Sequence, residues 1–259
     1  MRELALPENQ QNFAPTPLRL IYERARAVDG LGQLRECIDI LENPDIIVSE
    51  VLESFHAVDR AFEQGVLRPE ILSALSEEHI EQAEEPEWFY MGRDLSVLGD
   101  SCSFTCLSSN VEPIPLNDAP AKQFTDGFDF VGITCNGLAR PVLGTVQSET
   151  DTSAYPLLLR ALVGLAEMAP AIQLERLKHR FFKGALPEAP SFDLLLVTWY
   201  HDETEERTPI CQFTRDIAEL VKRTILEQSD FPGGVLNDIV CLGMNPDRFD
   251  GRMRFDWRV

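Results

Sequence analysis

Most of the structural information in this chain lies in residues 125–200, which begin with TDGFDFVGITCNGLARPVLGTVQSETDTSAYPLLLRALVGLAEM over 125–168. The pattern predicts one strand over 128–134 and a second strand over 141–147. The dipeptide Asn136-Gly137 between them is typical of a tight turn. The segment therefore opens with two neighbouring strands joined by a turn.

The residues that follow predict helices packed on this sheet. Residues 154–168 are apolar on nearly every side, which is typical of a helix buried on more than one face. A second helix is expected over 172–183, and an apolar strand is expected over 192–200. Nearly continuous apolar strands beside a buried helix indicate an α/β fold with a mixed central sheet flanked by helices.

An N-terminal helical region is expected ahead of this sheet. Thr16 and Pro17 form the pattern of a helix start, with Thr16 as the N-cap and Pro17 at the first helical position. Residues 45–64 place apolar side chains three and four apart, which predicts an amphipathic helix. Gly30 and Gly32 are expected to interrupt the helical region between the helix that starts at Pro17 and the helix over 45–64.

The acidic stretch 76–87 is poor in apolar side chains and marks the expected boundary between two parts of the chain. We predict an N-terminal arm and helical region, residues 1–87, and an α/β core domain, residues 88–259. The core domain is expected to finish with a helix over 213–226 and a half-buried strand over 252–259. The predicted buried face of that last strand consists of four alternate residues, Met253, Phe255, Trp257 and Val259.

The charge balance bears on the class of partner. The chain carries 43 acidic residues against 23 lysines and arginines, a formal net charge of −20. Most non-specific affinity for nucleic acid comes from phosphate neutralisation by lysine and arginine, so this balance disfavours a nucleic-acid partner. A basic protein partner, which the chain would neutralise, is an alternative that the same charge supports.

Two further features bear on the cellular setting. The sequence has no apolar run long enough for a membrane span and no secretory leader at its start, so no membrane association is expected. Its six cysteines are scattered and do not form the dense framework of a small secreted domain. These features favour a reduced, cytoplasmic setting.

The order of strand, turn, strand, buried helix and strand resembles the core of the PD-(D/E)xK (restriction-endonuclease-like) nuclease superfamily. Such nucleases hold a divalent metal ion with an aspartate on one core strand and an acid on the next strand. A lysine two residues beyond that acid orients the attacking water, and the metal supplies charge stabilisation. The resemblance covers residues 88–200 and implies a restriction-endonuclease-like core.

On this resemblance Asp129, or Asp126 just before the strand, takes the position of the first acid. The acid-x-lysine triplet falls on Thr145-Val146-Gln147, which contains neither the acid nor the lysine. A shift of two residues gives Gln147-Ser148-Glu149, which contains a carboxylate but again no lysine. The resemblance thus implies Asp129, Gln147 and Glu149 as candidate catalytic residues, with Asp129 and Glu149 as candidate ligands of Mg²⁺ or Mn²⁺.

The missing acid and lysine favour a non-catalytic, cytoplasmic interaction protein on a degenerate nuclease-like scaffold, with a protein partner and no cofactor. One alternative is a metal-dependent nuclease with an altered active site, which would use Mg²⁺ or Mn²⁺. The other alternative is the acidic protein that neutralises a basic protein partner. The sequence leaves the partner and the oligomeric state open.

Overall fold

The structure is a computed structural model that describes residues 15–64, 67–68, 102–106, 114–115, 130–134, 140–147, 153–180, 190–199, 209–227, 235–244 and 253–259. None of the helices in these ranges is long and apolar enough to cross a membrane.

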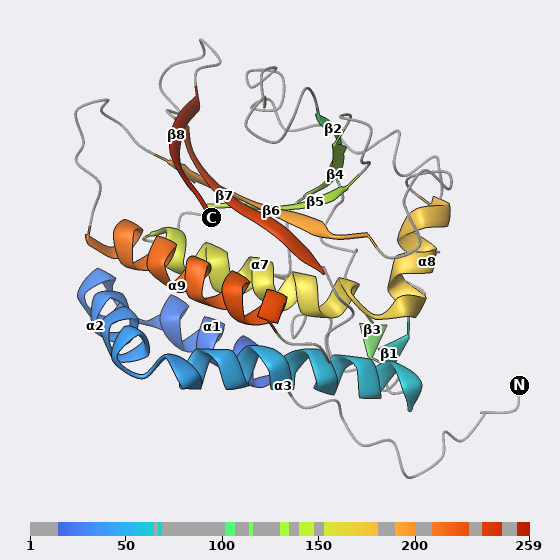
Figure 1. Cartoon of the computed structure of the whole chain (residues 1–259), viewed down its shortest axis with the longest axis horizontal. Helices are drawn as coiled ribbons and strands as arrows, with labels where there is room; N and C mark the ends of the chain where they lie inside the picture. The colour runs from blue at the N-terminus through green and yellow to red at the C-terminus, as the bar shows by residue number, and fades with distance from the viewer. Residues whose placement is uncertain are drawn as a thin grey trace, which may run out of the picture.

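A mixed six-stranded sheet forms the centre of the fold (Figure 1). Its strands, in spatial order, are β2 (Cys102–Cys106), β4 (Phe130–Thr134), β5 (Pro141–Val146), β6 (Phe192–Trp199), β7 (Leu236–Met244) and β8 (Met253–Arg258). The central strands β5, β6 and β7 are parallel, and the remaining pairings are antiparallel. Two short strands, β1 (Leu67–Arg68) and β3 (Ile114–Pro115), pair separately.

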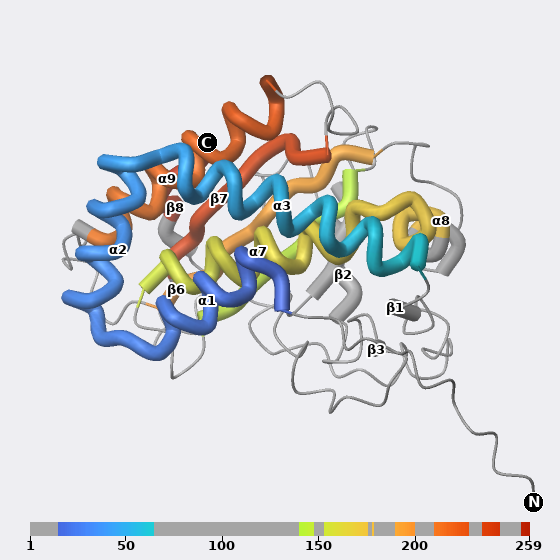
Figure 2. Tube along the Cα trace, turned by 90° about the horizontal axis from the view of Figure 1, so that it is seen from below, coloured from blue at the N-terminus to red at the C-terminus, as the bar shows by residue number. Residues whose placement is uncertain are grey.

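Helices form two layers on one side of this sheet (Figure 1). The inner layer consists of α7 (Ala154–Met168), which contacts β5 and β6, and α9 (Pro209–Glu227), which contacts β7. The outer layer consists of α1 (Pro17–Ala27), α2 (Gly30–Glu42) and α3 (Pro44–Glu63), which cross over the inner helices (Figure 2). A shorter helix, α8 (Ala171–Arg180), follows α7. The prediction of an α/β fold with a mixed, helix-flanked sheet is confirmed.

Helix α7 lies between the sheet and the outer helices, and every one of its residues is buried. This position explains its apolar sequence, because a helix covered on opposite sides has no face left for water. The Ser153 hydroxyl caps its start by accepting a hydrogen bond from the Tyr155 N–H. The observed bounds match the helix predicted over 154–168.

Side-chain hydrogen bonds join the N-terminal helices to this core. The buried Gln33 of α2 donates to the carbonyls of Ala25 and Val28, and it accepts from the Ser153 hydroxyl at 2.8 Å. The Ser54 hydroxyl of α3 accepts from the Leu18 N–H of α1 at 2.9 Å. The N-terminal helices and α7 therefore share one hydrophobic core. The predicted division at residue 87 falls outside the described residues and remains a prediction.

The start of α2 differs from the prediction. Gly30 and Gly32 were expected to interrupt the helices, yet α2 begins at Gly30 and includes both glycines. Asp29 is the N-cap, because its side chain accepts from the Gly32 N–H at 2.8 Å. The capping aspartate supplies a helix start that offsets the low helix propensity of the glycines.

The buried face of β8 was also predicted wrongly in part. Trp257 is buried as expected, but Phe255 is 47% exposed and Asp256 is 2% exposed. A bulge opposite Cys241 and Leu242 adds one residue to β8 and breaks the strict alternation. Side chains of a strand alternate between the two faces of the sheet only while its pairing with the neighbouring strand is regular. One inserted residue therefore moves the side chains beyond the bulge to the opposite face.

Candidate functional site

The predicted triplet lies at the carboxyl end of β5, and Gln147 there is hydrogen-bonded to β6 through its backbone and its side chain. Its N–H donates to the Val197 carbonyl at 2.8 Å. Its side-chain Oε1 accepts from the Trp199 N–H at 2.9 Å, and its own carbonyl accepts from the Trp199 indole Nε1–H at 2.5 Å. Gln147 thus fixes the last residue of β6 against the end of β5.

The other two residues of the triplet are held by α7. Thr145 is fully buried on the face that α7 covers, and its hydroxyl donates to the Leu157 carbonyl at 3.4 Å. The carbonyl of Val146 accepts from Arg160 Nη2 at 2.7 Å. The Thr145 hydroxyl, the Val146 carbonyl and both oxygens of Gln147 therefore have partners within the protein.

The other predicted site residues lie elsewhere in the sequence. Asp129, Asp126 and Glu149 fall outside the described residues, and their roles remain predictions. The first described residue of β4 is Phe130, whose Cα partner in β5 is Gly144. The antiparallel pairing of the two predicted strands is thus present.

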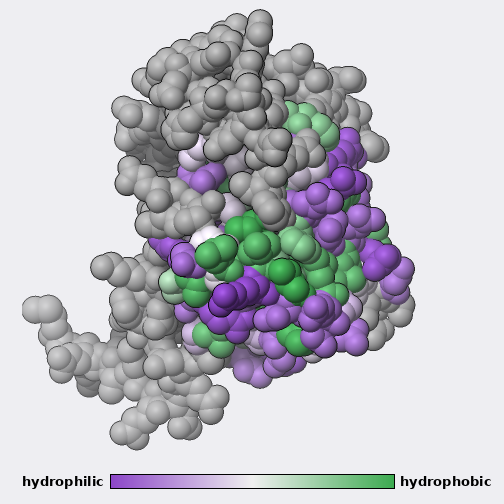
Figure 3. Space-filling model, turned by 90° about the vertical axis from the view of Figure 1, so that its left-hand side faces the viewer, coloured by the Kyte–Doolittle hydropathy of each residue, from purple (hydrophilic) through white to green (hydrophobic). Residues whose placement is uncertain are grey.

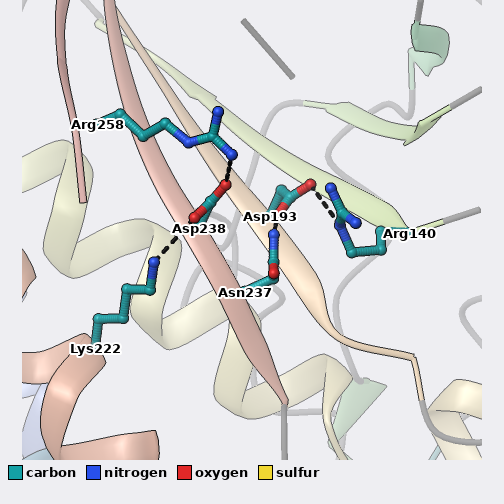
Figure 4. A network of polar contacts seen from close by, with 6 residues as sticks. All are labelled: Arg140, Asp193, Lys222, Asn237, Asp238 and Arg258. Carbon is teal, nitrogen blue, oxygen red and sulfur yellow. Dashed lines mark hydrogen bonds and ion pairs between the residues drawn. The ribbon is translucent and has the colours of Figure 1, made fainter. Parts of the chain in front are cut away.

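A second polar cluster lies near the amino ends of the parallel strands, where Asp193 of β6 and Asp238 of β7 are neighbours in register (Figure 4). Asp193 is 1% exposed. Its Oδ2 accepts from Arg140 Nε at 3.1 Å, and its Oδ1 accepts from Asn237 Nδ2 at 2.6 Å. A buried carboxylate needs such partners, because an unpaired one would lose its hydration without compensation.

Asp238 has two cationic partners that come from different elements. Lys222 of α9 donates to Oδ1 at 2.9 Å, and Arg258 of β8 donates to Oδ2 (Figure 4). These contacts tie the helix layer and the edge strand β8 to β7. Through these contacts, Asp193 and Asp238 connect the amino ends of β6 and β7 to the elements around them.

The two aspartates differ in acidity. Burial raises the pKa of Asp193 above its ordinary value, although the hydrogen bonds from Asn237 and Arg140 act in the opposite direction. Burial also acts to raise the pKa of Asp238, but the hydrogen bonds and charges of Lys222 and Arg258 outweigh it and lower that pKa. The pKa values of these two neighbouring aspartates are therefore shifted in opposite directions, so that Asp193 is the weaker acid and Asp238 the stronger one.

An open groove of about 450 Å³ lies beside this cluster, between α9 and the end of β8. It is lined by Arg215, Glu219, Lys222, Arg223, Leu226, Glu227, Arg258 and Val259. Two of its four cations, Lys222 and Arg258, are paired with Asp238. The groove has a mixed charge, because Glu219 and Glu227 of α9 line it together with the four cations.

Sequence patterns did not indicate the Asp193 and Asp238 cluster. A signal was present, because an aspartate inside the apolar run of β6 requires a buried partner. That partner, Arg140, lies 53 residues away in sequence, so periodicity along the chain does not identify it.

The two aspartates are engaged in pairing within the protein. Their carboxylates accept from cationic groups and an amide, so their chemistry here is structural. Over the described ranges, no group of three or more histidine, cysteine, aspartate or glutamate side chains is arranged to hold a metal ion. Comparison of the chain with protein-family models, with curated proteins and with solved structures finds no match.

Proposed function

We propose that this chain is a non-catalytic interaction protein on a restriction-endonuclease-like scaffold that has lost its metal site. The observation that carries the proposal is the pairing of Gln147 with Trp199, which uses the side chain and the carbonyl of Gln147 at once. In a nuclease of this kind the equivalent strand end would offer free ligands to a metal ion. Here the same strand end fastens β5 to β6.

The scaffold part of the proposal draws support from the order and direction of four elements. Strands β4 and β5 are antiparallel neighbours, α7 follows β5, and β6 then pairs parallel to β5. This is the order on which the sequence resemblance rests. The additional strands β7 and β8 extend the sheet beyond that core.

The burial of Thr145 supports the loss of catalysis. A carboxylate at this position would lie beneath α7, next to the Leu157 carbonyl, which repels a negative charge. Burying an ion there without a compensating partner is costly. A threonine hydroxyl suits the position because it can donate to that carbonyl.

A metal-dependent cleavage assay tests the proposal. Single- and double-stranded DNA and RNA would be incubated with Mg²⁺ or Mn²⁺ and with the wild-type protein, Asp129→Ala or Gln147→Glu. We expect no cleavage in any of the three, and no calorimetric signal for either ion that depends on Asp129. Cleavage by the wild-type protein that Asp129→Ala abolishes would instead establish the alternative, a metal-dependent nuclease with an altered active site.

The net charge of −20 favours one class of partner, a protein with a basic surface that this chain would neutralise. Crosslinking in the native cell followed by mass spectrometry would identify the partner, and the purified pair would then be titrated at increasing NaCl. Screening weakens attraction between oppositely charged surfaces, so we expect the dissociation constant to rise steeply with salt. A dissociation constant that does not change with salt would contradict this class of partner.

A further inference from the structure

Two cysteines far apart in sequence meet where α9 packs on β7. Cys211 is the third residue of α9, and Cys241 lies within β7. Cys241 is fully buried and belongs to the hydrophobic core, against which Cys211 packs. The two thiols lie within hydrogen-bonding reach of each other, and neither is in a disulfide.

The two positions differ in access. Figure 3 looks onto the end of the molecule that holds α2 and the start of α9, where apolar side chains gather among hydrophilic ones. Cys211 lies in the first turn of α9 and is only partly buried, whereas Cys241 is fully buried. The thiolate is the form of a cysteine that a peroxide oxidises.

Cys241 is suited to a different role. The neighbouring Cys211 and then burial raise the pKa of Cys241 well above its ordinary value, so this sulfur stays a thiol. Its full burial prevents direct attack by a reagent in solution. The sulfur of Cys211, by contrast, lies within its reach.

We propose that Cys211 and Cys241 form an oxidisable dithiol, in which a peroxide oxidises Cys211 and Cys241 then closes a disulfide between α9 and β7. In the first step the Cys211 thiolate attacks one peroxide oxygen, the O–O bond breaks, and a sulfenic acid and hydroxide form. In the second step the Cys241 sulfur attacks the sulfenic sulfur, and hydroxide leaves as the Cys241 proton is lost. Overall, two thiols and one hydrogen peroxide give one disulfide and two waters.

Oxidation would have a structural consequence. A disulfide requires the two sulfurs to be about 2.0 Å apart, closer than any hydrogen-bonded pair. The first turn of α9 must therefore move toward β7, or the two side chains must rotate. The bond would close a loop over residues 211–241 and restrict the unfolded chain.

Peptide mapping tests the proposal with the full chain. The folded protein would be treated with hydrogen peroxide, alkylated and digested with trypsin. Cys211 lies in the peptide 208–215, Cys241 in the peptide 224–248 and Cys37 in the peptide 36–60, each with a single cysteine. We expect peptides 208–215 and 224–248 to become linked and to separate again after treatment with dithiothreitol.

Three variants make the result specific. Cys211→Ser should abolish the link, and Cys241→Ala should leave a Cys211 sulfenic acid that dimedone traps. Cys37→Ser is the matched control, because Cys37 is fully buried and burial raises its pKa to about 12. Its substitution should leave the link intact. Circular dichroism would establish that each variant is folded.

The proposal predicts one further change, a rise in the thermal unfolding midpoint of the wild-type protein on oxidation that Cys211→Ser does not show. Oxidation of Cys211 to a sulfinic acid while Cys241 stays alkylatable would overturn the proposal. The same holds if both cysteines remain alkylatable after a peroxide treatment that oxidises a methionine-containing peptide added to the same sample.

Discussion

The Arg19 guanidinium donates a 3.1 Å hydrogen bond to the Glu167 carboxylate inside the core, where the two side chains are 5% and 3% exposed. The pair joins α1 to α7 across 148 residues of sequence. Burial raises the pKa of Glu167, and the adjacent positive charge of Arg19 acts against that rise. A pair of this kind adds little to stability as a unit, yet each charge becomes costly when its partner is removed.

Removal of one partner of this ion pair should therefore lower the free energy of unfolding more than removal of both partners. We expect Arg19→Met to lower the free energy of unfolding by about 3–5 kcal/mol, because it leaves the Glu167 carboxylate buried and uncompensated. The double variant Arg19→Met with Glu167→Leu should recover a large part of this loss. Equilibrium unfolding in urea measures both.

A matched control is the ion pair of Arg24 with Glu36, in which Arg24 is 64% exposed. Arg24→Met should change the free energy of unfolding by less than about 1 kcal/mol, because water screens the charge of the exposed Arg24 guanidinium, although Glu36 is only 11% exposed. Equal losses in Arg19→Met and Arg24→Met would contradict the account of the buried pair.

Asp193 and Asp238 should give opposite dependences of stability on pH. The pKa of Asp238 is lowered in the fold, so its contribution is present above the unfolded pKa of about 3.9 and is lost as pH falls below it. The pKa of Asp193 is raised, so the folded state binds its proton more tightly, and stability declines as pH rises above about 3.9.

Thermal unfolding between pH 2.5 and pH 6.5 would compare the wild-type protein with Asp238→Asn and Asp193→Asn. The stability difference between wild type and Asp238→Asn should grow as pH rises. The stability difference between wild type and Asp193→Asn should shrink as pH rises. Slopes of the same sign for the two variants would show that the assigned shifts are wrong.

The contact between Gln147 and Trp199 should contribute measurably to stability. Gln147→Ala removes the acceptor of the Trp199 N–H, and we expect a loss of about 1–3 kcal/mol in the free energy of unfolding. Gln147→Glu retains an acceptor oxygen and should lose less. The exposed Gln212 of α9 is the control, and Gln212→Ala should stay within about 0.5 kcal/mol of wild type. Urea unfolding, monitored by tryptophan fluorescence, would rank the stabilities of the three variants.

The two glycines of α2 should respond differently to alanine. A Cβ at Gly30 would have its nearest contact at 3.8 Å from the Ile210 Cδ1, so Gly30→Ala should be neutral or stabilising by up to about 1 kcal/mol. A Cβ at Gly32 would lie 2.9 Å from the Val28 Cβ, which has no flexible end to move aside. Gly32→Ala should therefore destabilise by about 1–3 kcal/mol. Thermal unfolding midpoints of both variants decide this, and a stabilised Gly32→Ala would refute it.

Local patterns in the sequence predicted the elements whose cause is local. The span of α7 follows from its apolar run and the Ser153 cap, and the start of α1 follows from the Thr16 hydroxyl, which accepts from the Arg19 N–H. The start of α9 at Pro209 lies four residues before the predicted residue 213. Proline at the first position of a helix is a signal that the apolar pattern alone does not contain.

The remaining features depend on contacts between distant segments. The exposure of Phe255 follows from a bulge opposite β7, and no property of β8 alone indicates it. In the same way, the cationic partner of Asp193 lies before β5, and the cationic partners of Asp238 lie on α9 and β8. Of the three candidate catalytic residues, only Gln147 belongs to the described residues, and its contact with Trp199 depends on the parallel pairing of β5 and β6.

The layered arrangement around α7 has a consequence for synthesis on the ribosome. Helix α7 begins 91 residues after α3 ends, as the difference between positions 154 and 63 shows. Translation proceeds at roughly 5–20 residues per second, so α7 is synthesised on the order of 5–20 s after α3. Until then the apolar sides of α1 and α3 lack the helix that covers them. During that interval the nascent chain exposes a surface that chaperones bind, so its yield in the cell should depend on translation speed between these two helices.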